Sequence, residues 1–291
     1  MPFVGGVVYK FLLGALVAAL MLVADRLLGL ATGRDAPRPP APGEPAGGAN
    51  HARSLVQVGR VLGIFILAGA LVSGGAKGLD WKADALWLLM FGSLAGLLFI
   101  VSARYGVRVL LRGRLQAEID RGNAAAGVAA AGHYVATALI VAAATGGEGW
   151  KMIAVSLAFF AIAQVVLHLF VILFRALTAY DDAEEILAEN LAAGVSYAGV
   201  TVGLGMIIAH AADGTFAGWL ALVTGFGPAL LWCVSLYVVR QVVVQWLILG
   251  APPRLWKGAL DEAIGRERNV GLAALEAGAY IGTALLLGHV S

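Results

Sequence analysis

Eight long runs of apolar residues constrain this chain more than any other feature of its sequence. They lie near residues 4–24, 54–74, 85–107, 125–145, 152–174, 192–211, 216–248 and 270–289. A helix needs about 20 apolar residues, each rising 1.5 Å, to cross the hydrocarbon of a bilayer. Only 13% of the residues are charged, whereas soluble domains carry about 25%. The sequence therefore predicts an all-α polytopic membrane protein with eight transmembrane helices.

The connections between these runs are too short and too apolar to hold a soluble domain, so we expect residues 1–291 to form a single membrane domain. The longest connection, residues 32–50, reads TGRDAPRPPAPGEPAGGAN and is expected to be a flexible loop, because it is rich in Pro and Gly. The start of the chain lacks the basic region and the cleavage site of a signal peptide. Cys233 is the one cysteine and cannot form an intrachain disulfide.

A spaced motif repeats four times, each time at the start of an even-numbered apolar run. An asparagine is followed nine residues later by a glycine, and four residues after that by a second small residue. The asparagines are Asn50, Asn123, Asn190 and Asn269, and the small residues are Gly59 and Gly63, Gly132 and Ala136, Gly199 and Gly203, and Gly278 and Gly282. The chain therefore reads as four two-helix units, approximately residues 1–75, 76–146, 147–213 and 214–291.

Helical geometry gives this motif a physical meaning. Nine residues at 3.6 per turn place the glycine on the side of the helix opposite the asparagine, with the second small residue next to the glycine. Such small-xxx-small strips let two helix backbones approach closely in lipid. An asparagine at a helix start can accept hydrogen bonds from the free N–H groups of the first turn. Two interpretations remain open: a cap with a packing strip, or a ring of asparagines that lines a polar vestibule.

The distribution of basic residues predicts the orientation in the membrane. Of the 20 Lys and Arg residues, all but four lie at the asparagine-bearing ends of the runs, and the exceptions are Lys10, Lys77, Lys82 and Lys151. The positive-inside rule places the asparagine-bearing side in the cytoplasm and both termini outside. All four units then point the same way, so they are parallel rather than inverted repeats.

The residues around two of the asparagines resemble a known family. The stretches LQAEIDRGNAAAGVAAAG and AEEILAENLAAGVSYAG are similar to the signature of the domain of unknown function 350 family, the YjfL-like bacterial inner-membrane proteins. The stretch around Asn269 shifts its acids, and the one around Asn50 keeps little beyond Asn50 and Gly59. The resemblance implies an inner-membrane location without naming an activity. It also implies a link to envelope-stress proteins or ATP-grasp-type ligases as partners.

Polar residues within the apolar runs are few, and each is a candidate for a functional role. They are Glu276, His168, Gln164, His133 and Arg60. Because an ionisable group exposed to lipid is costly, we expect Glu276 to face the bundle interior, toward a polar partner. The arginines near the ends of the odd runs, Arg104, Arg175 and Arg240, are interpreted as side chains that snorkel to lipid phosphates.

Acidic residues also gather before the asparagines. The candidates are Glu118, Asp120, Asp181, Asp182, Glu185 and Glu262. Paired carboxylates there could bind a metal or a polyamine, but such a cluster is more often a solvated amphipathic helix that pairs with its own arginines.

Catalytic signatures such as a Walker A loop, H-E-x-x-H, G-x-S-x-G or a cysteine pair are not present. We therefore expect no enzymatic activity, no cofactor and no bound metal, and the net charge of +2 does not indicate a nucleic-acid partner.

Two functions remain open. The one that the sequence favours is a pore or carrier for a small ion or cationic solute in an envelope-stress or envelope-modification system, with Glu276, His168, Gln164 and the asparagines lining the path. The other is a non-transporting anchor or scaffold for cytoplasmic envelope enzymes; a membrane-embedded enzyme ranks third. A continuous hydrated cavity along Glu276 and the asparagines would favour the pore, and a dry interior packed with small residues would favour the scaffold.

Overall fold

The computed structural model describes residues 2–31, 50–75, 80–212, 218–254 and 256–290. Nearly all of these residues are helical. The helices are α1 (Pro2–Ala31), α2 (His51–Gly75), α3 (Trp81–Leu110), α4 (Leu115–Asp120), α5 (Ala124–Ala144), α6 (Lys151–Ala176), α7 (Asp182–Leu187), α8 (Leu191–Ala212), α9 (Trp219–Val239), the π-helix η1 (Arg240–Ile248), α10 (Ala259–Gly265) and α11 (Val270–Val290). The flexible loop was predicted at residues 32–50, and all of it except Asn50 lies outside the described part of the chain.

Among the described residues, eight helices are long and apolar enough to cross a membrane, and they correspond to the eight predicted runs. The seventh span is composite, because α9 continues without a break into the π-helix η1. The protein is thus an all-α polytopic membrane protein with eight transmembrane helices. The three short helices α4, α7 and α10 each precede an even-numbered span.

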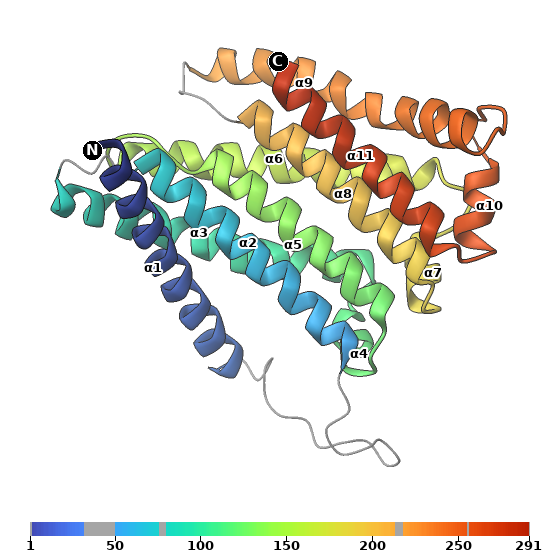
Figure 1. Ribbon diagram of the computed structural model, residues 1–291, viewed down its shortest axis with the longest axis horizontal. Coiled ribbons are helices and arrows are strands. Elements are labelled where there is room, and N and C mark those ends of the chain that lie inside the picture. Colours follow the sequence, from blue (N-terminus) through green and yellow to red (C-terminus); the bar gives the residue numbers. More distant parts are fainter. Residues whose placement is uncertain (1, 32–49, 76–79, 213–217, 255, 291) are drawn as a thin grey trace.

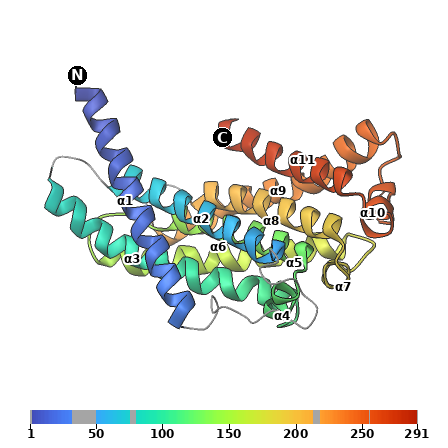
Figure 2. The ribbon, with the colours of Figure 1, turned by 60° about the horizontal axis from the view of Figure 1, so that its bottom comes forward.

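The four even-numbered spans form one row. Figure 1 shows α2, α5, α8 and α11 running side by side in the same direction, and the most extensive contacts in the molecule join α2 to α5, α5 to α8 and α8 to α11. Helices α3, α6 and α9 each pack against two neighbouring members of this row, whereas α1 packs mainly on α2 (Figure 2). The fold is therefore four parallel two-helix repeats. We call the end that carries the four asparagines the Asn end, and the opposite end the far end.

Glycines of the repeated motif set the spacing of this row. A Cβ atom placed on Gly59 would lie 2.4 Å from the Cα of Ala131, and one on Gly132 would lie 2.6 Å from the Cα of Ala198. Since carbon atoms normally pack about 3.5–4.0 Å apart, only glycine permits these backbone approaches. The second small residues also lie in contacts between helices, with Gly63 against Phe99 and Ala138, Ala136 against Gly205 and Gly203 against Tyr280.

The fourth strip departs from the prediction. A Cβ on Gly278 or Gly282 would meet nothing within 4 Å, so the expectation that these two glycines pack against a helix is wrong. The physical reason is their place in the row. Each strip faces the next even-numbered span, and α11 is the last of them. In α11 the close contact is instead made by Ala277, which packs against Gly199 of α8.

Candidate functional site

The four asparagines cap their helices and, in three cases, tie one repeat to the next. The Asn123 side chain accepts from the backbone N–H of Ala126 at 3.2 Å, and the other three make equivalent bonds. In three of the four, the amide group also donates to a carbonyl in the short helix of the following repeat. These bonds run from Asn50 to Ile119 at 2.7 Å, from Asn123 to Ile186 at 2.7 Å, and from Asn190 to Ile264 at 2.9 Å.

These bonds decide between the two interpretations of the motif. Asn123 and Asn190 are 1% and 0% exposed, so they cannot line an open vestibule. Asn269 is exposed, and its side chain accepts from the backbone N–H of Leu272 in the first turn of α11. All four asparagines therefore act as caps, and Asn50, Asn123 and Asn190 also link one repeat to the next.

The acidic candidates take part in the same links. Glu118 and Glu185 each lie five residues before an asparagine and accept from its amide at 2.6 and 2.9 Å. Ion pairs between repeats add to these bonds, and they join Arg53 to Asp120, Arg121 to Glu189 and Arg112 to Asp181. Glu262 and Asp181 match the solvated interpretation, since both are exposed. Glu262 pairs with Arg266, one turn further along the chain, and Asp181 pairs with Arg175.

A buried charge cluster lies inside the Asn end, between η1, α10 and α11. Arg240 donates from Nε to Glu276 at 2.5 Å and from a terminal nitrogen to Asp261 at 2.6 Å. The side chains of these three residues are 1–3% exposed. Glu276 therefore faces the interior, as the sequence predicted, and Arg240 is its partner. A buried carboxylate needs a charged or hydrogen-bonding partner, and Arg240 supplies one to both Glu276 and Asp261.

Two further groups complete the bonding of Glu276. The hydroxyl of Ser196, on α8, donates to one carboxylate oxygen at 2.5 Å, and that of Tyr280 donates to the other at 3.0 Å. A cavity of about 20 Å³ adjoins these side chains. Since one water needs about 10–15 Å³ of such space, this cavity holds a single water at most.

The position of Arg240 explains why it does not snorkel. It is the first residue of the π-helix η1, and its guanidinium binds Glu276 on α11 and Asp261 on α10 instead of a lipid phosphate. The sequence of a single apolar run could not show that these three residues lie close together. Arg175 is likewise paired, with Asp182 at 3.4 Å, and the side chain of Arg104 lies outside the described part.

Asp182, the first residue of α7, lines the same cavity and is 4% exposed. Burial raises the pKa of its carboxyl to about 7, although the Arg175 guanidinium opposes this rise. This buried acid contradicts the prediction of a solvated acidic cluster. The nearby Tyr180 also has its pKa raised, mainly by burial.

The other intramembrane candidates lie in different places. Arg60 forms a buried ion pair with Asp25 of α1, a residue that the predicted first run left out. His133 is 2% exposed and its ring lies 5.5 Å from that of His168, centroid to centroid. His168 bonds through Nδ1 to the backbone carbonyl of Gln164. The structure thus brings Glu276 together with none of the other predicted polar residues.

Within the described part of the chain, no group of three or more His, Cys, Asp or Glu residues has a geometry that could hold a metal ion.

Comparison with known proteins agrees with this arrangement. The family described as Domain of Unknown Function (DUF350) matches residues 3–145 and, in a second copy, residues 150–290. The chain belongs to this family. It is also similar to a UPF0719 transmembrane protein of Aquifex aeolicus, at 28% identity over 138 residues, which cover 46% of this chain and 51% of that protein. The chain thus aligns with about half the length of this curated relative, and no solved structure matches it.

Each DUF350 copy comprises two helix pairs, and the two copies differ in their buried charges. Ala130 occupies the position in the first copy that Glu276 occupies in the second, seven residues after the asparagine. Val200 likewise stands ten residues after Asn190, where Arg60 stands ten residues after Asn50. The Arg240 cluster is therefore a feature of the second copy, and the Asp25–Arg60 pair is a feature of the first.

Proposed function

We propose that this DUF350 protein is a non-transporting, non-catalytic membrane scaffold, which holds a charged surface at the Asn end for partners in the envelope. The observation that carries the proposal is the closed interior around Glu276. Its carboxylate is engaged by Arg240, Ser196 and Tyr280, and the adjoining cavity measures about 20 Å³. A hydrated ion path needs a continuous polar opening, and these groups fill the place where it would run.

The packing of the row supports the same function. Backbones in contact through Gly59, Gly132 and Gly199 leave no room for a solute between neighbouring even-numbered spans at the level of these glycines. The three asparagine links join each repeat to the next at one end. A rigid array of this kind suits a platform better than a carrier, which must alternate between two shapes.

For the location we propose the bacterial inner membrane, with the Asn end in the cytoplasm and both termini outside. The basic residues support this orientation. Among them are Arg254 and Lys257, which lie exposed at the Asn end. The partners that we propose are cytoplasmic proteins of an envelope-stress or ATP-grasp ligase system.

Flux measurements test the scaffold directly. Purified protein in liposomes should pass protons, potassium and a polyamine no faster than empty liposomes do. The variant Glu276→Gln should leave this background unchanged while lowering the unfolding temperature. A saturable flux that Glu276→Gln abolishes would overturn the proposal in favour of a carrier.

The orientation has its own test. In a chain with Cys233 replaced by serine, single cysteines at Glu267 and His289 mark the Asn end and the far end, where both side chains are exposed. A membrane-impermeant thiol reagent added to intact cells should label the cysteine at His289 only. Labelling at Glu267 alone would reverse the proposed orientation.

A further inference from the structure

The row of even-numbered spans has two open ends, and they carry different faces. Within the row, one face of each span packs against the opposite face of the next span. We call the first face the strip, whose residues stand two, nine and thirteen positions after the asparagine, and the second the receiving face, whose residues stand four and eight positions after it. The pairs in contact, strip residue first, are Ala52 and Gly127, Gly59 and Ala131, Ala125 and Gly194, Gly132 and Ala198, and Gly199 and Ala277. Among the described helices, the row therefore ends with an unused strip on α11 and begins with an unused receiving face on α2.

The unused strip of α11 is a track of small residues. Gly271, Gly278 and Gly282 stand at the strip positions, Ala274 lies between them, and all four are exposed. The exposed side of α6 carries large side chains instead, at Val165, Leu169 and Ile172. Because small residues let a second membrane helix approach closely, the strip of α11 suits a helix rather than lipid chains.

The receiving face of α2 is exposed and carries larger residues than that of the other spans. Ser54 stands where the other three spans have glycine or alanine, and Val58 where they have alanine. Val58 is 53% exposed, and Leu62 and Phe65, farther along the same face, are 51% and 55% exposed. The strip of α11 is correspondingly small, with Gly271 where the other spans have alanine. One more step of the row would thus set Gly271 against Ser54, where the internal contacts set alanine against glycine, so the two ends match in size.

Helix α1 also lacks one of its two neighbours. Arg60 and His133 both stand ten residues after an asparagine. Arg60 pairs with Asp25 of α1, and His133 packs against Gly106 of α3, so α1 holds toward α2 the place that α3 holds toward α5. Helix α3 also packs on α2, the preceding member of the row, whereas the described chain offers α1 no preceding member. A span placed before α2 would therefore contact both α2 and α1.

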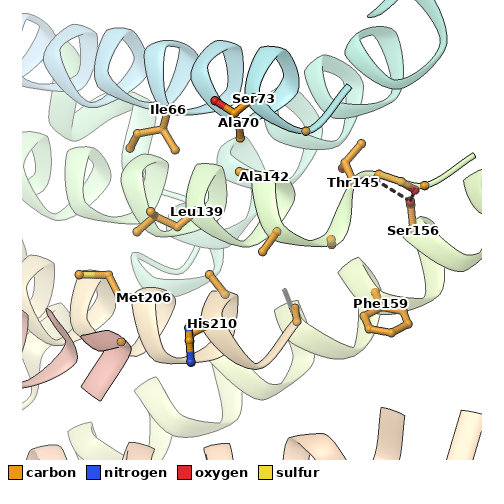
Figure 3. A pocket seen from close by; sticks show the side chains of 18 of the residues that line it. Ile66, Ala70, Ser73, Leu139, Ala142, Thr145, Ser156, Phe159, Met206 and His210 are labelled. Atoms are coloured by element: carbon orange, nitrogen blue, oxygen red, sulfur yellow. Dashed lines mark hydrogen bonds between the residues drawn. The ribbon is translucent and has the colours of Figure 1, made fainter. Parts of the chain in front are cut away.

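The contacts along the row end where a groove opens at the far end. This groove measures about 1060 Å³, and its lining begins 15 or 16 residues after each asparagine, at Ile66, Leu139, Met206 and Ala284. Figure 3 shows Ile66, Leu139 and Met206 on neighbouring helices around it. A continuation of the row should therefore make its contacts within the first 15 residues of each span, next to the Asn end.

We propose that a second copy of this chain continues the row, so that α11 of one copy packs against α2 and α1 of the next. Gly278 of the first copy lies against Val58 of the second, and Gly271 lies against Ser54. All spans keep one direction across the membrane, as the distribution of basic residues requires. A contact between two α11 strips would instead set small residues against small residues and leave α1 without its second neighbour. The contact is heterologous, so it builds a ring or an open array. It goes beyond the proposed scaffold, which needs one copy only.

Cysteine cross-linking in membranes tests the contact. Two chains with different affinity tags are co-expressed, both with Cys233→Ser, one with Val58→Cys and the other with Gly278→Cys. A disulfide needs Cα atoms about 4.4–6.8 Å apart, so oxidation should link the two tags where the proposed faces meet. We expect about fivefold more mixed-tag dimer than for Val58→Cys with Leu169→Cys, on the exposed side of α6.

A second pair tests the register. Ser54→Cys with Gly271→Cys should link as strongly as the first pair. Ser54→Cys with Gly278→Cys should link about fivefold less, because seven residues displace the cysteines by about 10 Å along α11. Gly278→Leu fills the strip without disturbing its own chain, since a Cβ there meets nothing within 4 Å. Added to the Gly271→Cys chain, it should lower the link to Ser54→Cys about fivefold.

Three results would overturn the proposal. The first is that neither pair links more than the control with Leu169→Cys. The second is that the Gly278→Cys chain links mainly to itself, which would show a contact between two α11 strips. The third is that pairs in and out of register link equally, which would show random collisions in the membrane.

Discussion

Replacing Gly199 by leucine tests the glycine contacts that order the four repeats. A Cβ atom at this position would lie 2.3 Å from the Cβ and 2.5 Å from the Cα of Ala277. Carbon atoms pack about 3.5–4.0 Å apart, so α8 and α11 must separate by more than 1 Å for the first carbon of the side chain alone. The Cα of Ala277 belongs to the backbone and cannot rotate away.

The magnitude follows from this geometry. Overpacking a buried site costs about 1–3 kcal/mol, and the contact that α8 loses along α11 adds to that cost. We therefore expect the free energy of unfolding to fall by about 3 kcal/mol, which is the upper end of this range. For a chain of this size, about 1 kcal/mol shifts the unfolding temperature by about 2–4 °C. Gly199→Leu should therefore lower that temperature by about 6–12 °C.

The chain supplies both the reporter and the control. Cys233 is its one cysteine and is 0% exposed, so a fluorogenic maleimide reacts with it only as the detergent-solubilised protein unfolds. Gly278→Leu makes the same chemical change next to Ala277 in sequence, at a site where a Cβ would meet nothing within 4 Å. That variant should unfold within about 2 °C of the wild type. Equal shifts for the two variants would refute the reasoning from the row of helices.

The remaining predictions use the same thermal assay. Asn190→Ala should lower the free energy of unfolding by about 2–4 kcal/mol, because it removes a helix cap and leaves the buried Ile264 carbonyl without its donor. Asn269→Ala removes a helix cap alone and should lower it by about 1 kcal/mol. Equal losses would mean that the link between repeats contributes nothing. Arg240→Met should lower the free energy of unfolding by about 3–5 kcal/mol, since the carboxylates of Asp261 and Glu276 then stay buried without their cation. A variant as stable as the wild type would show that these two carboxyl groups are not ionised. Asp182 has its pKa raised to about 7 by burial, against about 3.9 when unfolded. The folded state thus keeps a proton that the unfolded state loses, and the contribution of Asp182 to stability should fall as pH rises from about 4 to about 7. Asp182→Asn should remove that slope, and an unchanged slope would assign it to another group.

The sequence by itself determined the membrane class, the eight spans and the four-fold repeat. These follow from local properties: the length of each apolar run, and a motif whose spacing is read directly along the chain. The role of the asparagines as caps is local too, because the bonds reach only two or three residues onward. The prediction that Glu276 faces inward needed only the cost of a charge in lipid.

Only the tertiary structure decided which groups meet. Arg240 binds Glu276 and Asp261, which lie 36 and 21 residues away in the sequence, and no pattern within one apolar run predicts these contacts. The links from Asn50, Asn123 and Asn190 to the next repeat cross 63 to 74 residues, and Asp25 needed its partner Arg60 before it could be recognised as buried. The same reason explains the error at Gly278 and Gly282. Their spacing is that of the other strips, but a strip packs only where a neighbouring helix faces it, and position in the row is a property of the assembled fold.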